Sequence, residues 1–144
     1  MFEYEYPRPA VSVDVIVSCM IEGEEHILLI QRKHDPYQGS WALPGGFLDM
    51  DETLEQAAAR ELKEETCLDA LSVCQIGTFS AVDRDPRSRV ITTAFEATID
   101  PVQTPIAADD AADWQWKNLN SEIELAFDHA EILKLWEEKR SHQA

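Results

Sequence analysis

The fold is decided by residues 45–68, which read GGFLDMDETLEQAAARELKEETCL. Two glycines open the stretch, and glycine lets a backbone turn tightly or approach a ligand closely. Thr53 followed by Gln56 fits the capping box of a helix start, and neither Gly nor Pro interrupts residues 54–65. The stretch therefore predicts a glycine turn followed by a helix that begins after Thr53.

The glutamates of this predicted helix fall on its apolar face. At a period of about 3.6 residues, Glu61 and Glu65 share a face with Ala57 and Ala58, and Glu64 lies close to it. Like charges four residues apart repel by about 0.2–0.5 kcal/mol even when exposed, and burial raises this cost. A cation between them would remove the conflict, and oxygen ligands suit Mg²⁺ or Mn²⁺ rather than Zn²⁺. The pattern favours a metal site, with Glu61 and Glu65 as first ligands and Glu64 next. The alternative is a helix whose glutamates pair with neighbouring Arg and Lys.

The same stretch resembles the Nudix box, G-x5-E-x7-R-E-U-x-E-E-x-G-U, in which U is a bulky aliphatic residue. The residues that fit at the required spacing are Gly46, Glu52, Arg60, Glu61, Leu62, Glu64, Glu65 and Leu68. Cys67 departs from the pattern, because it stands where the box has glycine. The resemblance implies an α/β fold, an α/β/α sandwich with a mixed β-sheet between helices. It also implies Mg²⁺-dependent hydrolysis of a nucleoside diphosphate linked to another group.

Roles for individual positions follow from this resemblance. The implied catalytic residues are Glu64, Glu61, Arg60 and Glu52. Arg60 is expected to orient a carboxylate of the box, and Glu52 to make the same kind of contact. Gly45 and Gly46 are expected beside the substrate, with the carbonyl of Gly45 completing the metal shell. The general base stays open between a box glutamate and an acid of a later loop, for which Asp109 and Asp110 are candidates.

A basic loop at residues 83–89, DRDPRSR, offers further substrate contacts. It holds three of the twelve basic residues of an acidic chain, and guanidinium forks suit phosphate oxygens. Arg84 and Arg87 are therefore candidate substrate-binding residues. The alternative, which stays open, is a surface ion-pair cluster of these arginines with Asp83 and Asp85.

Two more segments, LPGGF at 43–47 and LAFDH at 125–129, extend the resemblance. Together with the basic loop they are similar to the ADP-ribose pyrophosphatase branch of the family, and to the Nudix half of certain NAD-metabolism repressors. This resemblance implies cleavage of ADP-ribose to AMP and ribose 5-phosphate. The alternatives are a hydrolase of nucleoside triphosphates, including oxidised ones, and a ligand sensor without catalysis. The intact box glutamates favour turnover over sensing.

Several residues have a functional and a structural interpretation. The aromatic side chains that offer a stacking surface for adenine are Trp41, Phe79, Trp114 and Trp116, and core packing is the expected fate of most. His129 is a candidate substrate contact, but a core or capping role is expected for it and for Asp128. His34 and Tyr37 lie in a loop that is a candidate pocket wall. The glycine that Cys67 replaces should have a positive φ just past the helix end. A cysteine that keeps this conformation costs about 1–2 kcal/mol, so altered stability or an altered helix ending is expected, and not a loss of metal binding.

Size and charge narrow the class of protein. At 144 residues the chain fits one domain, residues 1–144, and no apolar run approaches the ~20 residues of a membrane span. The N-terminal residues lack the pattern of a secretory signal, so none is expected, and three cysteines without metal spacing favour a reduced, cytoplasmic setting. A net charge of −16 argues against binding to nucleic acid or an anionic membrane. A chain ending at Ala144 without a basic recognition helix argues further against DNA binding. The family resemblance allows a homodimer.

Hydrophobic patterning predicts the remaining elements. The expected strands are residues 10–20, 26–32, 70–81, 89–99 and 112–117, with a short extended piece at 41–47. Gly77 should mark a bulge or bend in the strand at 70–81. A closing amphipathic helix is expected from residue 126 or 127 to 139.

Overall fold

The computed structural model describes residues 1–101, 103 and 111–142. The strands are β1 (Ala10–Ile21), β2 (Glu24–Arg32), β3 (Trp41–Ala42), β4 (Gly45–Phe47), β5 (Ala70–Phe79), β6 (Val90–Ile99) and β7 (Ala111–Asn118). The helices are α1 (Leu54–Thr66) and α2 (His129–Ser141). These elements match the predicted ones in type and order, although α2 begins at His129 rather than at residue 126 or 127. The candidate bases Asp109 and Asp110 lie outside the described residues.

Helix α1 starts and ends as its sequence predicts. Thr53 Oγ1 accepts a hydrogen bond from the Gln56 N–H, at 3.1 Å, and Gln56 Oε1 accepts one from the Thr53 N–H, at 2.8 Å. This reciprocal pair satisfies two of the unpaired N–H groups of the first turn. Cys67 ends the helix at a φ of 61°, the left-handed conformation that glycine would adopt without strain.

The sheet is mixed, because β1 runs parallel to β6 and antiparallel to its other neighbours. The strand order is β3-β2-β1-β6-β5, with β4 added to β1 and β7 to β2. The register between β5 and β6 shifts between Gln75 and Gly77, which confirms the predicted irregularity at Gly77.

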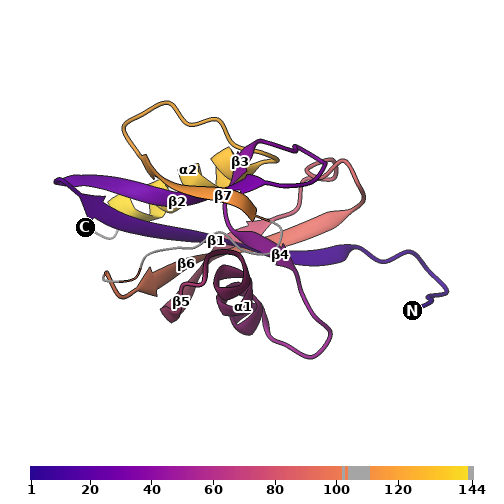
Figure 1. Ribbon diagram of the computed structural model, residues 1–144. Helices are drawn as coiled ribbons and strands as arrows, with labels where there is room; N and C mark the ends of the chain where they lie inside the picture. The colour runs from indigo at the N-terminus through magenta and orange to yellow at the C-terminus, as the bar shows by residue number, and fades with distance from the viewer. Residues whose placement is uncertain (102, 104–110, 143–144) are drawn as a thin grey trace.

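Alternating side chains of the sheet build one core on each face. On β1, Val13, Val15 and Val17 pack in the cluster that holds Ala57, Ala58 and Leu62 of α1. Ile16 of β1 packs instead in the cluster that holds Ile132, Leu133 and Trp136 of α2. Figure 1 shows α1 and α2 on opposite sides of the sheet. The predicted α/β/α sandwich is confirmed.

Strand β1 shares one of its edges between two partners. β6 occupies the other edge from Ala10 to Val17. On the shared edge, β4 pairs with residues 12–14 of β1, and β2 pairs with residues 18–21. β2 and β4 therefore diverge along β1 and leave a fork between them. No helix within the described residues is long and apolar enough to cross a membrane.

Candidate active site

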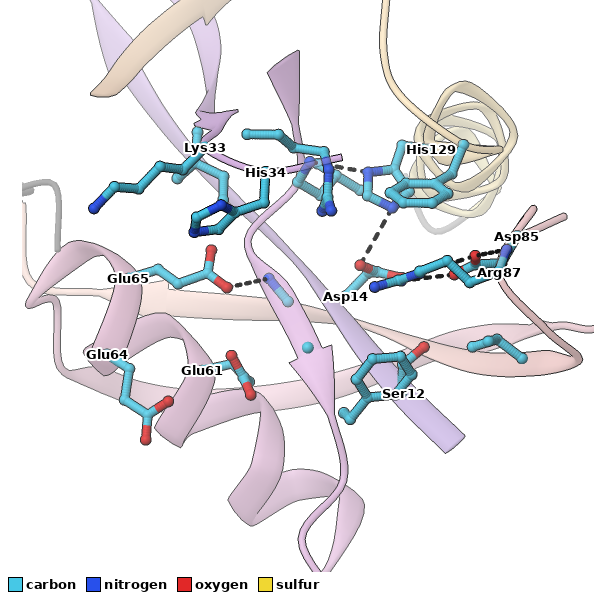
Figure 2. Close-up of a pocket in the computed structure, with 18 of the residues that line it drawn as sticks. Ser12, Asp14, Lys33, His34, Glu61, Glu64, Glu65, Asp85, Arg87 and His129 are labelled. Carbon is cyan, nitrogen blue, oxygen red and sulfur yellow. Dashed lines mark hydrogen bonds and ion pairs between the residues drawn. The ribbon is translucent and has the colours of Figure 1, made fainter. Parts of the chain in front are cut away.

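A pocket of about 510 Å³ opens at this fork, and Figure 2 shows the side chains that line it. Its walls come from β1, β2, β4, α1, the β5–β6 loop and the start of α2. Figure 2 shows Glu61, Glu64 and Glu65 of α1 to one side of Asp14, with Asp85, Arg87 and His129 to the other. The predicted glutamates and the basic loop, which lie far apart in sequence, thus meet in one pocket.

Two glutamates of α1 are buried, as the helical period predicts. Glu61 is 9% exposed and Glu65 is 5% exposed. Burial and the nearby charge of Glu61 raise the pKa of Glu65 well above its ordinary value. Burial also raises the pKa of Glu61, partly offset by Arg60. Glu65 Oε1 accepts a hydrogen bond from the Gly45 N–H, at 3.4 Å, whereas its buried Oε2 has no hydrogen-bond partner among the residues that the structure describes.

Both glycines before the box are needed for close packing. A Cβ atom on Gly46 would lie 2.5 Å from Cδ of Glu61, and one on Gly45 would lie 2.2 Å from the carbonyl oxygen of Val13. Neither contact is possible for a real side chain. The glycine pair therefore lets β4 lie directly against the carboxylate of Glu61 and the backbone of β1.

Arg60 holds the acids around it in place. Its Nε and Nη2 donate to the two oxygens of Glu52, at 2.9 and 2.6 Å. Its Nη1 donates to Glu61, at 2.9 Å, and to Glu64, at 3.1 Å, and Nη2 also donates to the carbonyl oxygen of Phe47, at 3.0 Å. One guanidinium thus ties three box glutamates to the end of β4. This is the orienting geometry that the sequence predicts for Arg60 and Glu52.

The glutamate pair fits a hard divalent cation. Among the residues that the structure describes, no three His, Cys, Asp or Glu side chains are already gathered as metal ligands. The side chain of Glu64 is 46% exposed and bonded to Arg60. The unpartnered Glu65 Oε2, the adjacent Glu61 and the all-oxygen donor set nevertheless suit Mg²⁺ or Mn²⁺, which keep waters in their shells.

The two arginines of the basic loop have different environments. Arg84 is buried, and its Nε and Nη2 donate to the two oxygens of Asp128, at 2.9 and 2.6 Å. Arg87 is half-exposed and bonds the buried carboxylate of Asp85 through Nε and Nη2, at 3.1 and 2.7 Å. The ion-pair alternative was thus correct for Arg87 but named the wrong partner for Arg84. The sequence could not show this partner, because it lies 44 positions away.

Asp14 and His129 form a buried polar pair that sequence reasoning missed. Asp14 Oδ2 accepts a hydrogen bond from Thr92 Oγ1, at 2.7 Å, and Oδ1 lies 3.3 Å from His129 Nε2. Burial alone would raise the pKa of Asp14, but His129, Thr92 and Arg84 outweigh it and lower the pKa. The sequence did contain a signal for this pair, because Asp14 is the one charged residue in the apolar, β-branched run of residues 10–17.

The imidazole of His129 has a fixed tautomer. Its Nδ1 accepts a hydrogen bond from the Leu43 N–H, at 3.0 Å, so Nδ1 carries no proton. Nε2 therefore carries the ring proton and donates it toward Asp14. His129 has the predicted core role. Asp128 occupies the N-cap position of α2, as a capping role predicts, but its side chain makes no cap hydrogen bond and pairs with Arg84 instead.

The aromatic surface of the pocket comes from residues other than the four named from sequence. Trp41 and Phe79 pack against one core and Trp114 and Trp116 against the other, which confirms their structural role. Phe127 and Phe47 line the pocket instead. The Arg87 guanidinium lies over both rings, at 5.7 and 5.1 Å from their centroids.

Phe127 is held at the pocket by an unusual backbone and by its neighbours. Its φ of 52° is uncommon for a bulky residue. Residues held in such rare backbone conformations cluster at functional sites. Tyr37 packs against its ring, with centroids 4.8 Å apart, so the loop of Tyr37 and His34 does form a wall of this site.

Comparison with known proteins agrees with this geometry. The NUDIX domain family model matches residues 11–136, and the chain belongs to the NUDIX family. An ADP-ribose pyrophosphatase of Methanocaldococcus jannaschii is 45% identical over 130 residues, which are 90% of this chain and 73% of the relative. The ADPR-responsive transcriptional repressor NtrR of Acinetobacter baylyi is 34% identical over 134 residues. This chain spans about half of the repressor, 54% of its length.

Solved structures share the fold and carry relevant ligands. The NUDIX domain of Shewanella oneidensis NrtR, in complex with ADP ribose, has a TM-score of 0.85 and 30% identity, covering 93% of this chain and 90% of that one. A bifunctional NMN adenylyltransferase/ADP ribose pyrophosphatase of Francisella tularensis, complexed with AMP and a Mn ion, has a TM-score of 0.78 and 34% identity. That alignment covers 94% of this chain and 43% of the other.

Proposed function

We propose that this protein hydrolyses the diphosphate of ADP-ribose, giving AMP and ribose 5-phosphate. The observation that carries the proposal is the buried pair Glu61 and Glu65, which face a pocket that also holds arginine and aromatic side chains. The 45% identity to an ADP-ribose pyrophosphatase over 90% of the chain supports the choice of substrate.

The pocket has suitable surfaces for both ends of this substrate. The diphosphate would lie beside Glu61, Glu65 and the backbone of Gly45 and Gly46, where a bound cation offsets the acidic charge. The adenine would stack on Phe127, beside the guanidinium of Arg87. Arg84 would support the site indirectly, since its guanidinium is already hydrogen-bonded to both carboxylate oxygens of Asp128.

Glu61 and Glu65 would hold a divalent cation, Mg²⁺ or Mn²⁺, with Glu64 and the carbonyl of Gly45 as further ligands. Such a cation neutralises charge on the diphosphate oxygens and lowers the pKa of bound water. Arg60 and Glu52 would orient the box carboxylates. The donor set supports the assignment, because it contains only oxygen and includes an unpartnered buried carboxylate atom.

The reaction adds one water across the P–O–P linkage. The water oxygen bonds to one phosphorus, the bridging oxygen leaves with the other phosphate, and a base takes up the proton of the water. Glu64 is a candidate base, because it lines the pocket and its side chain is 46% exposed. Asp109 and Asp110 remain candidates from the sequence.

The second candidate function is a ligand sensor. It is favoured by the 34% identity to an ADPR-responsive repressor and by the fold of the NrtR domain in complex with ADP ribose. A structure of S. oneidensis NrtR with DNA is also similar, at 30% identity, but this chain covers 63% of that protein. The net charge of −16 argues against DNA binding by the present chain itself. We further propose that it works in the cytoplasm as a homodimer.

An assay with ADP-ribose and Mg²⁺ tests the proposal. The wild type should release AMP and ribose 5-phosphate, and E65Q should lose at least about 100-fold in kcat/KM, because an electrostatic group at the reacting phosphate contributes several kcal/mol. E138Q, which changes an exposed glutamate of α2, is the matched control and should retain full activity. Equal rates for wild type and E65Q would contradict the metal role of Glu65. Tight binding of ADP-ribose without products would favour the sensor, and release of pyrophosphate from a nucleoside triphosphate would favour the triphosphate hydrolase.

A further inference from the structure

A row of contacts connects the aromatic end of the pocket to the glutamates. The ring of Phe127 lies 5.5 Å from that of His129, centroid to centroid, and His129 Nε2 lies 3.3 Å from Asp14 Oδ1. Asp14 Oδ1 in turn lies close to Gly45, 2.5 Å from the position that a Cβ atom on this glycine would occupy. The Gly45 N–H donates a hydrogen bond to Glu65. Asp14 therefore sits between the aromatic surface and the acidic end (Figure 2).

Two hydrogen-bond donors and one nearby guanidinium stabilise the carboxylate of Asp14 as an anion. Thr92 gives an O–H, His129 gives the N–H of its fixed tautomer, and the Arg84 guanidinium lies 3.9 Å away. The side chain of Asp14 is 10% exposed, and Asp14 is among the residues that line the pocket. Each carboxylate oxygen accepts about two hydrogen bonds, so Asp14 retains acceptor capacity toward the pocket.

A buried anion restricts what can lie over it. A phosphate would be repelled, and an ether or carbonyl oxygen would find no donor. The neutral donors of an adenine nucleotide are the amino group of its base and the hydroxyl groups of its ribose, and the ribose lies between base and phosphate. The order of groups in the pocket, Phe127, then Asp14, then Glu65, is the order of base, sugar and phosphate.

We infer that Asp14 is a specificity-determining residue that accepts hydrogen bonds from the ribose hydroxyls of the adenosine half of the substrate, and so selects ribonucleotides over deoxyribonucleotides. This inference rests on the proposed function and assigns a contact to it. Hydrogen bonds to a charged partner contribute about 1.5–3 kcal/mol, which corresponds to about 10- to 150-fold in kcat/KM.

The test compares ADP-ribose with two analogues, one lacking the 2′-hydroxyl of the adenosine ribose and one lacking the 2-hydroxyl of the terminal ribose. The wild type should lose at least about tenfold in kcat/KM on the adenosine analogue and little on the other. In D14N the ratio between ADP-ribose and the adenosine analogue should fall toward one, because the amide no longer offers a charged acceptor. E138Q, at an exposed position of α2 outside the pocket lining, is the matched control and should keep the wild-type ratio.

Each outcome decides between defined alternatives. Wild-type protein that hydrolyses ADP-ribose and its adenosine analogue equally well overturns the inference and leaves the proposed function intact. Loss confined to the terminal-ribose analogue, or an unchanged ratio in D14N, also overturns it. Absence of ADP-ribose hydrolysis by the wild type contradicts the proposed function itself.

A second measurement covers the case in which D14N does not fold. A crystal structure of the wild type with ADP-ribose, prepared in EDTA, should show an adenosine ribose hydroxyl within about 3.2 Å of an Asp14 carboxylate oxygen. A ribose bound away from Asp14 would overturn the inference.

Discussion

Glu65 combines burial, a nearby like charge and an oxygen without a hydrogen-bond partner. Each of these features disfavours the ionised carboxylate in the metal-free protein. A bound cation would reverse the balance, because it favours the anion directly. The residue that the proposed reaction depends on is thus one that the metal-free fold accommodates at a cost in stability.

This cost gives a pH-dependent prediction for Glu65. Since the pKa of Glu65 in the folded protein is raised above its ordinary value of 4.5, the folded state retains a proton that the unfolded chain has lost. The free energy of unfolding should therefore fall as pH rises from about 4.5 through the raised pKa. In EDTA, E65Q should melt at a higher temperature than the wild type at pH 8, and the difference should vanish near pH 4.

The control for this measurement is E138Q, on an exposed position of α2, which should follow the wild-type melting curve at both pH values. If E65Q melts below the wild type at pH 8 without metal, the buried carboxylate is not destabilising and the argument from burial fails.

At the scale of elements, both helices are fixed by contacts at their ends. Helix α1 has a complete capping box at its start, and Cys67 at its end has a φ of 61°. The start of α2 is joined to distant parts of the chain by Arg84–Asp128 and by the Leu43 N–H donating to His129. The second set of contacts explains how a loop and a helix far from the box in sequence come to line the same pocket.

The end of α1 gives a prediction about stability. C67G should stabilise the protein by about 1 kcal/mol. It removes the cost of about 1–2 kcal/mol that a residue with a Cβ has in the left-handed region. Part of this gain is offset, because glycine loses more conformational entropy than cysteine on folding. For a domain of this size the melting temperature should rise by about 3 °C. C67A retains a Cβ and should bring no such gain. A gain of equal size in C67A would assign the effect to the thiol and not to the backbone.

At the scale of the molecule, the sequence predicted the sandwich, the order of elements and the glutamate pair, because periodicity and the box depend on local spacing. The long-range contacts that hold the pocket wall opposite α1 were beyond its reach. The bond from Arg84 to Asp128 spans 44 positions and that from His129 to Leu43 spans 86. No periodic pattern encodes such pairs. Phe127 was missed for a related reason, since its place in the pocket depends on a positive φ that the sequence does not signal.

Metal binding should be visible in the stability of the whole domain. A ligand that binds only the folded state stabilises it by about 2.7 kcal/mol at 100 times its dissociation constant. MgCl₂ at that level should raise the melting temperature of the wild type by about 8 °C and leave E65Q nearly unchanged. With a net charge of −16, any added salt reduces self-repulsion, so NaCl at matched ionic strength is the reference. An equal rise of the melting temperature in NaCl would mean that charge screening, and not Mg²⁺ binding, causes the stabilisation.

The divided edge of β1 has a consequence for how this domain can diversify. The opening exists because two strands separate from a third, and the loops after β2 and β5 form part of its walls. Lengthening or replacing the segments between β2 and β3 or between β5 and β6 would therefore reshape the pocket while the helix that carries Glu61 and Glu65 stayed where it is. Relatives with different loops could in this way act on substrates with different leaving groups while they keep the same hydrolytic residues.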